Sequence, residues 1–332
     1  MSQAEQVQPG CVFDGYQVDS VLGRGANATV YLAQQTHRGT WHALKVLHSV
    51  DSRRKMRIEQ EAIFRDELRH PNIVPATEAI NVYDHAALVM DFVEGPSLVA
   101  WLDEGTPDLL DVLALFRGIV AGVHHAHSHQ VIHRDLKPSN VLLQPGPDQT
   151  WVPRISDFGL AKALSPDLSR FGGLTTVNTS LGTAGYAAPE QIRDASGVDS
   201  RADLYSLGCI LYEMICGVAP FAGLSTFDTL TAQVGDRYTD PATLAPGLPP
   251  DLYTLIRDLM RSDPDHRIQG CDEVLQRVDQ LLQPLAGAAV ASPGSSRAPV
   301  PGLGLDGLIP VLVLCGLPLF ALVLGSAVVF LT

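Results

Sequence analysis

The stretch HSHQVIHRDLKPSN, residues 127–140, decides how this sequence is interpreted, because it joins a helical segment to a loop rich in charged side chains. Residues 109–129 have the apolar spacing of one long amphipathic helix, so the histidines lie at its predicted end. They have no Cys, Asp or Glu nearby at the spacing of metal ligands. We therefore expect the chemistry in the residues that follow, and no metal at His124, His125, His127 and His129.

The loop after this helix carries three polar residues at short spacing. Asp135 is followed two residues later by Lys137 and five residues later by Asn140, and Asp157 follows a short apolar strand in RISDFGLAK. Phosphoryl transfer requires an oriented acceptor for the attacking hydroxyl, a cation near the transferred phosphate, and oxygen ligands for Mg²⁺. Asp135 and Lys137 suit the first two roles. Asn140 and Asp157 suit the third.

A second motif, LGRGANATV at residues 22–30, holds a Gly-x-Gly turn. A dinucleotide-binding turn opens into a helix, whereas TVYLA after Ala28 favours a strand. A hairpin over nucleotide phosphates and an ordinary hairpin turn remain as alternatives. Lys45 in HALKVL favours the first, because a lysine among apolar strand residues needs an anionic partner. Phosphate oxygens and a carboxylate on the next helix would supply it, and Glu61 is the candidate.

The order of predicted elements indicates an α+β protein. Residues 12–48 and 86–93 read as short strands, with a single helical segment at 52–69 between them. From about residue 97 the chain becomes mostly helical, and no repeat is present. The sequence therefore predicts a strand-rich part followed by a larger helical part.

Composition narrows the classes of partner and compartment. The chain has 332 residues, 46% of them hydrophobic and 18% charged, which indicates a globular protein with a sizeable core. A net charge of −13 argues against nucleic acid as a partner. The five cysteines are scattered, which favours a reducing compartment over a disulfide framework or zinc site. The N-terminus lacks the basic and apolar regions of a signal peptide.

The C-terminal segment, residues 308–331, is uncharged and long enough to cross a membrane. A membrane helix tolerates Pro310 and Pro318, and the alternative is a buried core helix. Residues 283–307 are rich in Pro, Gly and Ala and predict a linker. We expect a single-pass anchor in the cell (inner) membrane, in contact with membrane lipid, with the preceding domain in the cytoplasm.

Taken together, the motifs resemble those of the eukaryotic-like serine/threonine protein kinases, most closely the bacterial membrane-anchored type. The matching segments occur in family order: LGRGANATV, HALKVL, HRDLKPSN, DFG (157–159), GTAGYAAPE (182–190), DLYSLG (203–208) and DPDHR (263–267). The resemblance covers roughly residues 16–282 and implies a two-lobed protein kinase fold. The β-rich N-lobe would span about 16–93 and the helical C-lobe about 97–282.

The resemblance also implies which residues bind ATP and Mg²⁺, with Mn²⁺ as an alternative ion. Asp135, Lys137 and Lys45 are the expected catalytic residues, and Asn140 and Asp157 the metal ligands. Lys45 would hold the α- and β-phosphates and pair with Glu61. Phe92 would belong to the hinge strand. The expected nucleotide-binding residues are Leu22, Gly23, Arg24, Gly25, Ala26, Asn27, Ala28, Thr29, Val30, Ala43, Lys45, Glu61, Met90, Asp91, Val93 and Leu142. Ala28 departs from the family, which has a third glycine there.

Supporting and substrate-related residues follow from the same resemblance. Glu190 would form a buried ion pair with Arg267, and Asp203 would hydrogen-bond the catalytic loop, which His133 helps to pack. Lys137 in DLKPSN, together with Thr183, indicates serine and threonine hydroxyls of proteins as substrates.

Regulation by phosphorylation is a further expectation. Arg134 can grip a phosphate on the segment between DFG and APE. Membrane tethering would favour autophosphorylation between two copies, and Ala321 and Gly325 would help two spans meet. A catalytically inactive kinase-fold scaffold is the alternative function, but Lys45 and the metal ligands are all present. The candidate modification sites are Thr175, Thr176, Thr179 and Ser180.

Overall fold

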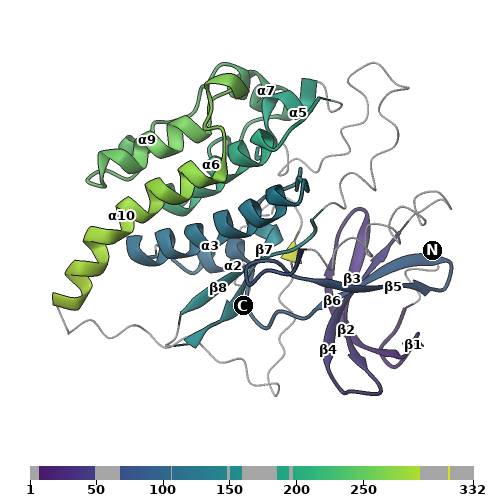
Figure 1. Ribbon diagram of the computed structural model, residues 1–332. Helices are drawn as coiled ribbons and strands as arrows, with labels where there is room; N and C mark the ends of the chain where they lie inside the picture. The colour runs from purple at the N-terminus through teal and green to yellow at the C-terminus, as the bar shows by residue number, and fades with distance from the viewer. Residues whose placement is uncertain are drawn as a thin grey trace, which may run out of the picture.

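The structure is a computed structural model of the 332-residue chain. It describes residues 7–48, 68–105, 107–147, 150–158, 185–193, 197–291 and 313–314. The chain forms a twisted sheet on one side and a group of helices on the other, as Figure 1 shows. The predicted organisation into a β-rich N-lobe and a helical C-lobe is therefore confirmed.

The N-lobe sheet has the strand order β1-β2-β3-β4-β6-β5, with antiparallel neighbours. Alternation of apolar side chains places one face in a buried cluster that includes Tyr31, Leu44 and Val89. The opposite face of the sheet lies toward the C-lobe. Its strands are β1 (Val12–Phe13), β2 (Tyr16–Arg24), β3 (Ala28–Gln35), β4 (Trp41–Leu47), β5 (Ala76–Val82) and β6 (His85–Asp91).

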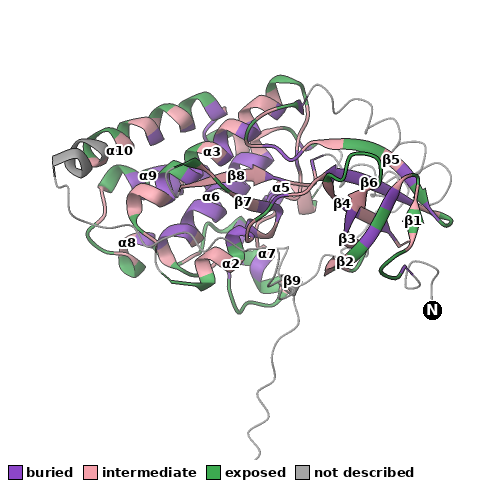
Figure 2. Ribbon diagram, turned by 90° about the horizontal axis from the view of Figure 1, so that it is seen from below, coloured by how far each residue is buried: buried purple, intermediate pink, exposed green. Residues whose placement is uncertain are grey.

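The C-lobe is built around two long helices, α3 (Leu109–Ser128) and α6 (Arg201–Cys216). Buried residues occupy most of α6, which is purple along much of its length in Figure 2. The other helical elements are α2 (Leu98–Asp103), η3 (Pro138–Asn140), α5 (Pro189–Arg193), α7 (Thr226–Val234), α8 (Pro241–Leu244), α9 (Pro250–Leu259), η6 (Pro264–His266) and α10 (Cys271–Ala291).

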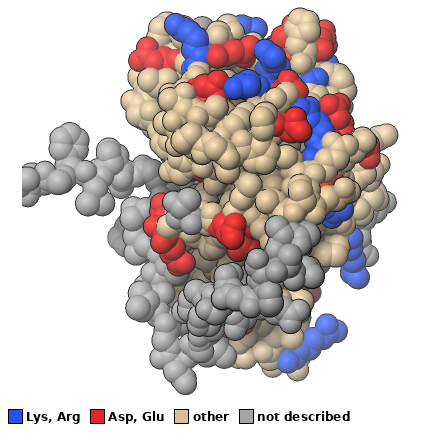
Figure 3. Space-filling model, turned by 90° about the vertical axis from the view of Figure 1, so that its left-hand side faces the viewer, with Lys and Arg blue, Asp and Glu red and all other residues tan. Residues whose placement is uncertain are grey.

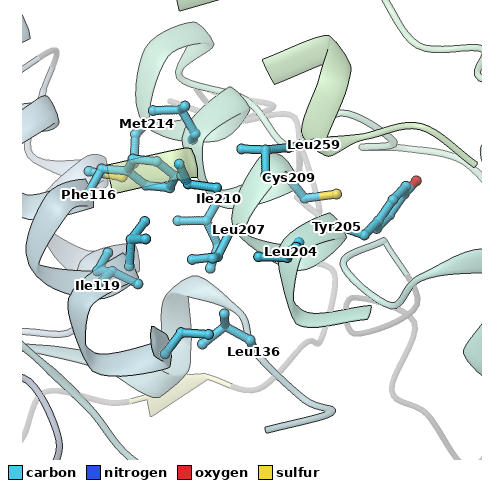
Figure 4. Packing of buried hydrophobic residues seen from close by; sticks show 14 of the residues in the cluster. Phe116, Ile119, Leu136, Leu204, Tyr205, Leu207, Cys209, Ile210, Met214 and Leu259 are labelled. Atoms are coloured by element: carbon cyan, nitrogen blue, oxygen red, sulfur yellow. The ribbon is translucent and has the colours of Figure 1, made fainter. Parts of the chain in front are cut away.

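Close packing in the C-lobe fixes the position of the loop after α3. Figure 4 shows Phe116 and Ile119 of α3 facing Leu207 and Ile210 of α6, with Leu136 nearby. Leu136 is 1% exposed, although it immediately follows Asp135 in the loop. The apolar core therefore anchors the loop at the residue beside its predicted acceptor.

A small hairpin lies between the lobes, formed by β7 (Val141–Pro145) and β8 (Trp151–Ile155). Backbone hydrogen bonds run from Ile155 N to Asn72 O, 2.9 Å, and from Val74 N to Ile155 O, 2.8 Å. Residues 72–74, which lead into strand β5 of the N-lobe, are thus tied to the strand β8 that precedes Asp157.

Charged side chains of both signs are interspersed over the upper part of the face shown in Figure 3. Ion pairs also join the helices of the C-lobe. Arg117 of α3 pairs with Asp279 of α10, and Arg277 of α10 lies 2.9 Å from Asp258 of α9. Exposed pairs of this kind contribute little stability individually.

The predicted helix at 109–129 is confirmed by α3. Among the described residues, α3 is the one helix long and apolar enough to cross a membrane, and it packs in the core against α6, α10 and β8. The segment predicted as a helix at 52–69 lies almost entirely outside the described residues.

The C-terminal expectations have a different outcome. Helix α10 runs to Ala291 and so extends into the segment predicted as a linker from residue 283. Within the predicted membrane helix, the described residues are Val313 and Leu314, which form the strand β9 (Val313–Leu314) beside Gly23 and Arg24 of β2. These two residues are therefore not helical, and a membrane-spanning helix at 308–331 is not shown.

Candidate active site

The Gly-rich turn is a β-hairpin. Gly23 pairs with Val30 and Arg24 with Thr29, and Gly25 N donates to the Ala28 carbonyl over 2.8 Å. Leu22 lies at the end of β2, while Ala26 and Asn27 complete the turn. A strand follows the turn, as expected, so this is not the strand-to-helix turn of a dinucleotide-binding motif. Ala28 is accommodated as the first residue of β3.

His48, just after β4, holds this turn from the neighbouring strand. Its Nε2 lies 2.8 Å from Thr29 Oγ1, and its Nδ1 lies 3.2 Å from the Ala26 carbonyl. Its backbone N–H donates to the Asn27 carbonyl over 3.0 Å. Thr29 is 2% exposed, so its hydroxyl serves this contact. Sequence reasoning missed His48, because nothing in the local pattern distinguishes it from any other strand-end histidine.

One cluster of apolar side chains joins the two lobes, and we refer to it as the apolar pocket because the adenine of ATP is expected to bind against it. The buried residues Ala43, Val74, Met90 and Val93 form one cluster, and four partly buried side chains pack against it: Leu22, Val30, Ala76 and Leu142. Ala43 and Met90 are partners across β4 and β6. The structure thus brings together six of the expected nucleotide-binding residues. Val74 and Ala76 were not among those expected.

Lys45 lies in the middle of the sheet and forms an ion pair across the cleft. It is flanked by Val30 on β3 and Leu88 on β6. Its Nζ lies 2.7 Å from Asp157 Oδ1, and the two side chains are 15% and 20% exposed. Among the described residues, Asp157 is therefore the anionic partner of Lys45. The predicted partner, Glu61, lies outside the described residues.

Asp135, Lys137 and Asn140 are brought together in the loop after α3. Lys137 Nζ lies 3.0 Å from Asp135 Oδ2. The Asn140 amide nitrogen donates to the Asp135 carbonyl over 2.7 Å and approaches its Oδ2 at 3.3 Å. The Asp135 side chain remains 37% exposed. Its carboxylate is thus oriented by two donors while staying accessible to a substrate hydroxyl.

The expected metal ligands suit a hard cation such as Mg²⁺. Ser156 N donates to the Asn140 carbonyl over 2.8 Å, which brings the residue before Asp157 alongside Asn140. The hydrogen bonds of Asn140 to Asp135 engage the amide nitrogen, so its oxygen is the atom suited to a cation. A carboxylate and an amide oxygen are ligands that Mg²⁺ prefers. Asp157 has φ 68°, a left-handed conformation that non-glycine residues adopt mostly at constrained functional sites.

Asp203 of α6 supports the loop from below, as expected. It accepts hydrogen bonds from His133 N at 2.8 Å and Arg134 N at 2.9 Å. His127 Nε2 lies 2.8 Å from the same carboxylate. Complete burial opposes ionisation of Asp203, but the His127 hydrogen bond and the positive surroundings hold its pKa below the ordinary value. One of the opening histidines thus has a structural role that the sequence did not reveal.

The expected ion pair between Glu190 and Arg267 is present. Arg267 donates from Nη1 to Glu190 Oε1 at 2.7 Å and from Nη2 to Oε2 at 3.1 Å. The Arg267 side chain is fully buried and also donates to the carbonyls of Arg201 and Arg261. Its guanidinium lies over the Tyr205 ring. This bidentate pair fixes the start of α5 on the helical core.

Other expectations fall on residues outside the described part of the chain. These include the candidate modification sites at 175–180 and Thr183. Arg134 is described, and its φ of 67° is again left-handed. Its expected contact with a phosphate therefore stays a prediction.

The protein kinase domain family model matches residues 16–278 of this chain. The serine/threonine-protein kinase PknJ of Mycobacterium tuberculosis is 34% identical over 278 residues, which are 81% of this chain and 46% of that protein. The serine/threonine-protein kinase PrkC of Bacillus subtilis is 30% identical over 263 residues, 78% of this chain and 39% of that protein. The chain thus spans less than half the length of these relatives.

A solved structure agrees with the fold. The crystal structure of the Mycobacterium tuberculosis PknI kinase domain superposes with a TM-score of 0.63 at 24% identity. The match covers 83% of this chain and 99% of the other. At this identity the likeness establishes the fold alone.

Proposed function

This chain belongs to the protein kinase family, and we propose that it is an ATP-dependent serine/threonine protein kinase. One observation carries the proposal. Asp135, Lys137 and Asn140 form one hydrogen-bonded cluster, and the Lys45–Asp157 ion pair joins the two lobes beside the apolar pocket. An acceptor, two cations and two oxygen ligands bordering one cleft meet the requirements of phosphoryl transfer.

Each residue has a chemical task in this mechanism. The apolar pocket holds the adenine, and the Gly-rich hairpin covers the phosphates. Lys45 neutralises phosphate charge, and Asp157 and Asn140 are the side chains that would hold Mg²⁺. The bound ion supplies charge neutralisation at the phosphate oxygens.

Asp135 orients the attacking hydroxyl and accepts its proton during transfer. Lys137, held beside Asp135, supplies positive charge near the transferred group. Because phosphoryl transfer leaves little covalent chemistry to the protein, most of the catalytic effect would come from positioning and electrostatics.

The acceptor class rests on sequence likeness. DLKPSN, with Lys137, resembles the serine/threonine type, and the relatives named above carry that name. The proposed substrates are therefore serine and threonine hydroxyls of proteins. Mg²⁺ is the proposed ion, and Mn²⁺ would take the same oxygen ligands.

Membrane attachment and self-activation are parts of the same proposal. Residues 308–331 are uncharged and apolar and would form a single-pass anchor in the inner membrane. Tethering raises the local concentration, so two copies would phosphorylate each other in the segment that holds Thr175, Thr176, Thr179 and Ser180. Arg134 would bind the new phosphate.

Phosphate incorporation from labelled Mg-ATP into the chain and a generic protein substrate tests the activity. Asp157→Asn should lower it at least ~100-fold, since a lost metal ligand removes several kcal/mol of transition-state stabilisation. Asp279→Asn, which alters an exposed carboxylate paired with Arg117, is the matched control and should retain wild-type activity. Removal of the metal ion by EDTA should abolish phosphate transfer in the wild type and in both variants. A wild-type chain that leaves ATP unchanged would make the inactive-scaffold alternative correct.

Membrane attachment needs a separate test. The full chain should sediment with membranes and resist alkaline carbonate extraction, whereas a chain ending before residue 308 should remain in the supernatant. Equal partitioning of the two chains contradicts the anchor.

A further inference from the structure

Gln191, in the short helix α5, connects two segments that are far apart in the sequence. Its side-chain Nε2 donates to the backbone carbonyl of Arg134 over 2.9 Å. Its Oε1 accepts from the backbone N–H of Ala188 over 2.8 Å. Both polar ends of one amide are therefore engaged, one with the catalytic loop and the other with the segment that leads into α5.

The Arg134 carbonyl belongs to the peptide group that carries Asp135. The N–H on the other side of this peptide group, that of Asp135, approaches His133 Nδ1 at 3.2 Å. Gln191 and His133 thus hold the same peptide plane from its two edges. Because a peptide group is planar, fixing both edges fixes its orientation and the position of the Asp135 Cα from which the side chain starts.

This peptide group needs such restraint. Arg134 has φ 67°, a region that is unfavourable for a residue with a side chain. The Asp203 carboxylate accepts a hydrogen bond from the N–H of Arg134, but as an acceptor it has no proton to donate to the carbonyl of that residue. Among the described residues, Gln191 is the side chain that supplies a hydrogen bond to this carbonyl.

The other end of the Gln191 amide rests on a well-anchored segment. Tyr186 donates its hydroxyl to Glu213 at 2.6 Å, and its carbonyl accepts from Ser206 Oγ at 2.8 Å. The Ala187 carbonyl accepts from Gln233 at 3.1 Å. Helices α6 and α7 therefore fix residues 186 and 187, so the Ala188 N–H presents a stationary reference for Gln191.

From these contacts we infer that Gln191 is a positioning residue for phosphoryl transfer. Its two hydrogen bonds connect the fixed segment 186–188 to the peptide group before Asp135. This connection restrains the loop so that the Asp135 carboxylate lies where it can accept the proton of the substrate hydroxyl. The inference rests on the proposed kinase function. Because Gln191 contacts none of the residues of the apolar pocket, its loss should act on the transfer step and leave ATP binding intact.

Two substitutions of nearly the same shape separate the two contacts. Gln191→Met removes both hydrogen bonds. Gln191→Glu keeps an oxygen for the Ala188 N–H but replaces the donor to the Arg134 carbonyl with a second oxygen. If the Arg134 contact orients Asp135, both variants should lose activity. The control is Gln34→Glu, because Gln34 also donates its side-chain amide to a backbone carbonyl, that of Gly39, but it lies at the exposed turn between β3 and β4.

The full-length proteins are compared by kcat, KM for ATP and melting temperature with and without Mg-ATP. A misplacement of about 1 Å costs up to ~100-fold in rate, so kcat should fall about 10- to 100-fold in both Gln191 variants. KM for ATP should stay within about twofold, since transition-state and ground-state effects separate in these parameters. Mg-ATP should raise the melting temperature of both variants as it does in the wild type, and Gln34→Glu should keep wild-type kcat.

The possible contrary results are distinct. Wild-type kcat in both variants overturns the role of Gln191, and so does a loss confined to Gln191→Met, which would assign the effect to Ala188 alone. A raised KM for ATP at unchanged kcat overturns it as well. A wild-type chain that transfers no phosphate overturns the proposed function and this inference with it.

Discussion

The catalytic loop and the Gly-rich turn border the same cleft, but they are held in very different ways. The loop around Asp135 rests on a fully buried carboxylate, on a core leucine at 136, and on side chains from α5 and α6. The Gly-rich turn lies at the end of the β2–β3 hairpin, closed by the bond from Gly25 N to the Ala28 carbonyl, and it is held from outside the hairpin by His48 and by the short strand β9. The loop around Asp135 is therefore fixed by the helical core of the C-lobe, whereas the Gly-rich turn is attached at the end of its hairpin.

This difference separates two tasks of the site. A proton acceptor must be in position before its substrate arrives, because displacements of even 1 Å are costly in rate. A cover over the phosphates has to admit and release a nucleotide, and few buried contacts allow local opening at low free energy. Changes beneath the loop should therefore lower stability and kcat together, whereas changes at the turn should act mainly on KM for ATP.

The largest effect is expected at Asp203. Asp203→Asn removes a buried charge that accepts from two backbone N–H groups and from His127, and it places an amide N–H against a donor. Loss of one partner in a buried charged network costs about 3–5 kcal/mol. We expect a melting temperature roughly 10 °C lower and kcat reduced at least ~100-fold. Calorimetry and phosphate incorporation measure both.

The control for this change is Asp199→Asn, because Asp199 lies before α6 and its side chain is 51% exposed beside Arg201. That variant should lose less than about 1 kcal/mol. Equal stability losses in the two variants would show that the buried position of Asp203 has no special importance.

The difference in folding stability between wild type and Asp203→Asn should depend on pH. The pKa of Asp203 is held below its ordinary value, so its carboxylate stabilises the fold fully above the unfolded-state pKa of about 3.9. That contribution is lost as the pH falls through the lower folded-state pKa. The stability difference between wild type and Asp203→Asn should shrink as the pH falls below about pH 4. Denaturant unfolding of both proteins between about pH 3 and pH 8 measures this stability difference. A difference that grows on acidification would contradict the prediction.

A smaller effect is expected at Gly95, which lies between the two lobes. A Cβ at this position would overlap the Leu143 carbonyl oxygen, so Gly95→Ala forces the backbone apart. Val93 and Leu142 of the apolar pocket flank this contact and should separate. Overpacking of this kind costs about 1–3 kcal/mol. We expect a lower melting temperature and a KM for ATP raised about 3- to 10-fold.

Gly270→Ala provides the matched comparison, since nothing lies within 4 Å of a Cβ at Gly270. Its melting temperature and KM should equal those of wild type. If Gly95→Ala behaves in the same way, the approach of the chain to β7 is not tight in solution.

The sequence predicted the parts of the site that depend on short spacing. Asp135, Lys137 and Asn140 lie in one loop, so their proximity follows from the chain itself. The hairpin at the Gly-rich turn and the helix α3 follow from local apolar patterns. Resemblance to the kinases supplied the apolar pocket and the Glu190–Arg267 pair, which no local pattern would have joined.

The supporting contacts were not predictable in this way, because they join residues distant in sequence. His127 meets Asp203 across 76 positions, and Gln191 meets Arg134 across 57. His48 and Thr29 are 19 apart and meet only because β3 and β4 pair in one register. Each of these side chains is ordinary in its local sequence and acquires a role only when the chain folds.

The smallest effect is expected at His48, and it tests the other side of the comparison. His48→Phe removes two side-chain contacts to the Gly-rich turn but leaves the backbone bond to Asn27 in place. A partly exposed hydrogen bond contributes about 0.5–1.5 kcal/mol, which corresponds to a KM for ATP raised about 3- to 10-fold. Because no residue beneath Asp135 is altered, kcat should stay within about twofold of wild type and the melting temperature should fall by less than about 3 °C. His37→Phe, at an exposed position in the β3–β4 turn, is the control and should change neither parameter. A loss of kcat in His48→Phe as large as in Asp203→Asn would mean that the turn and the loop are equally rigid parts of one site.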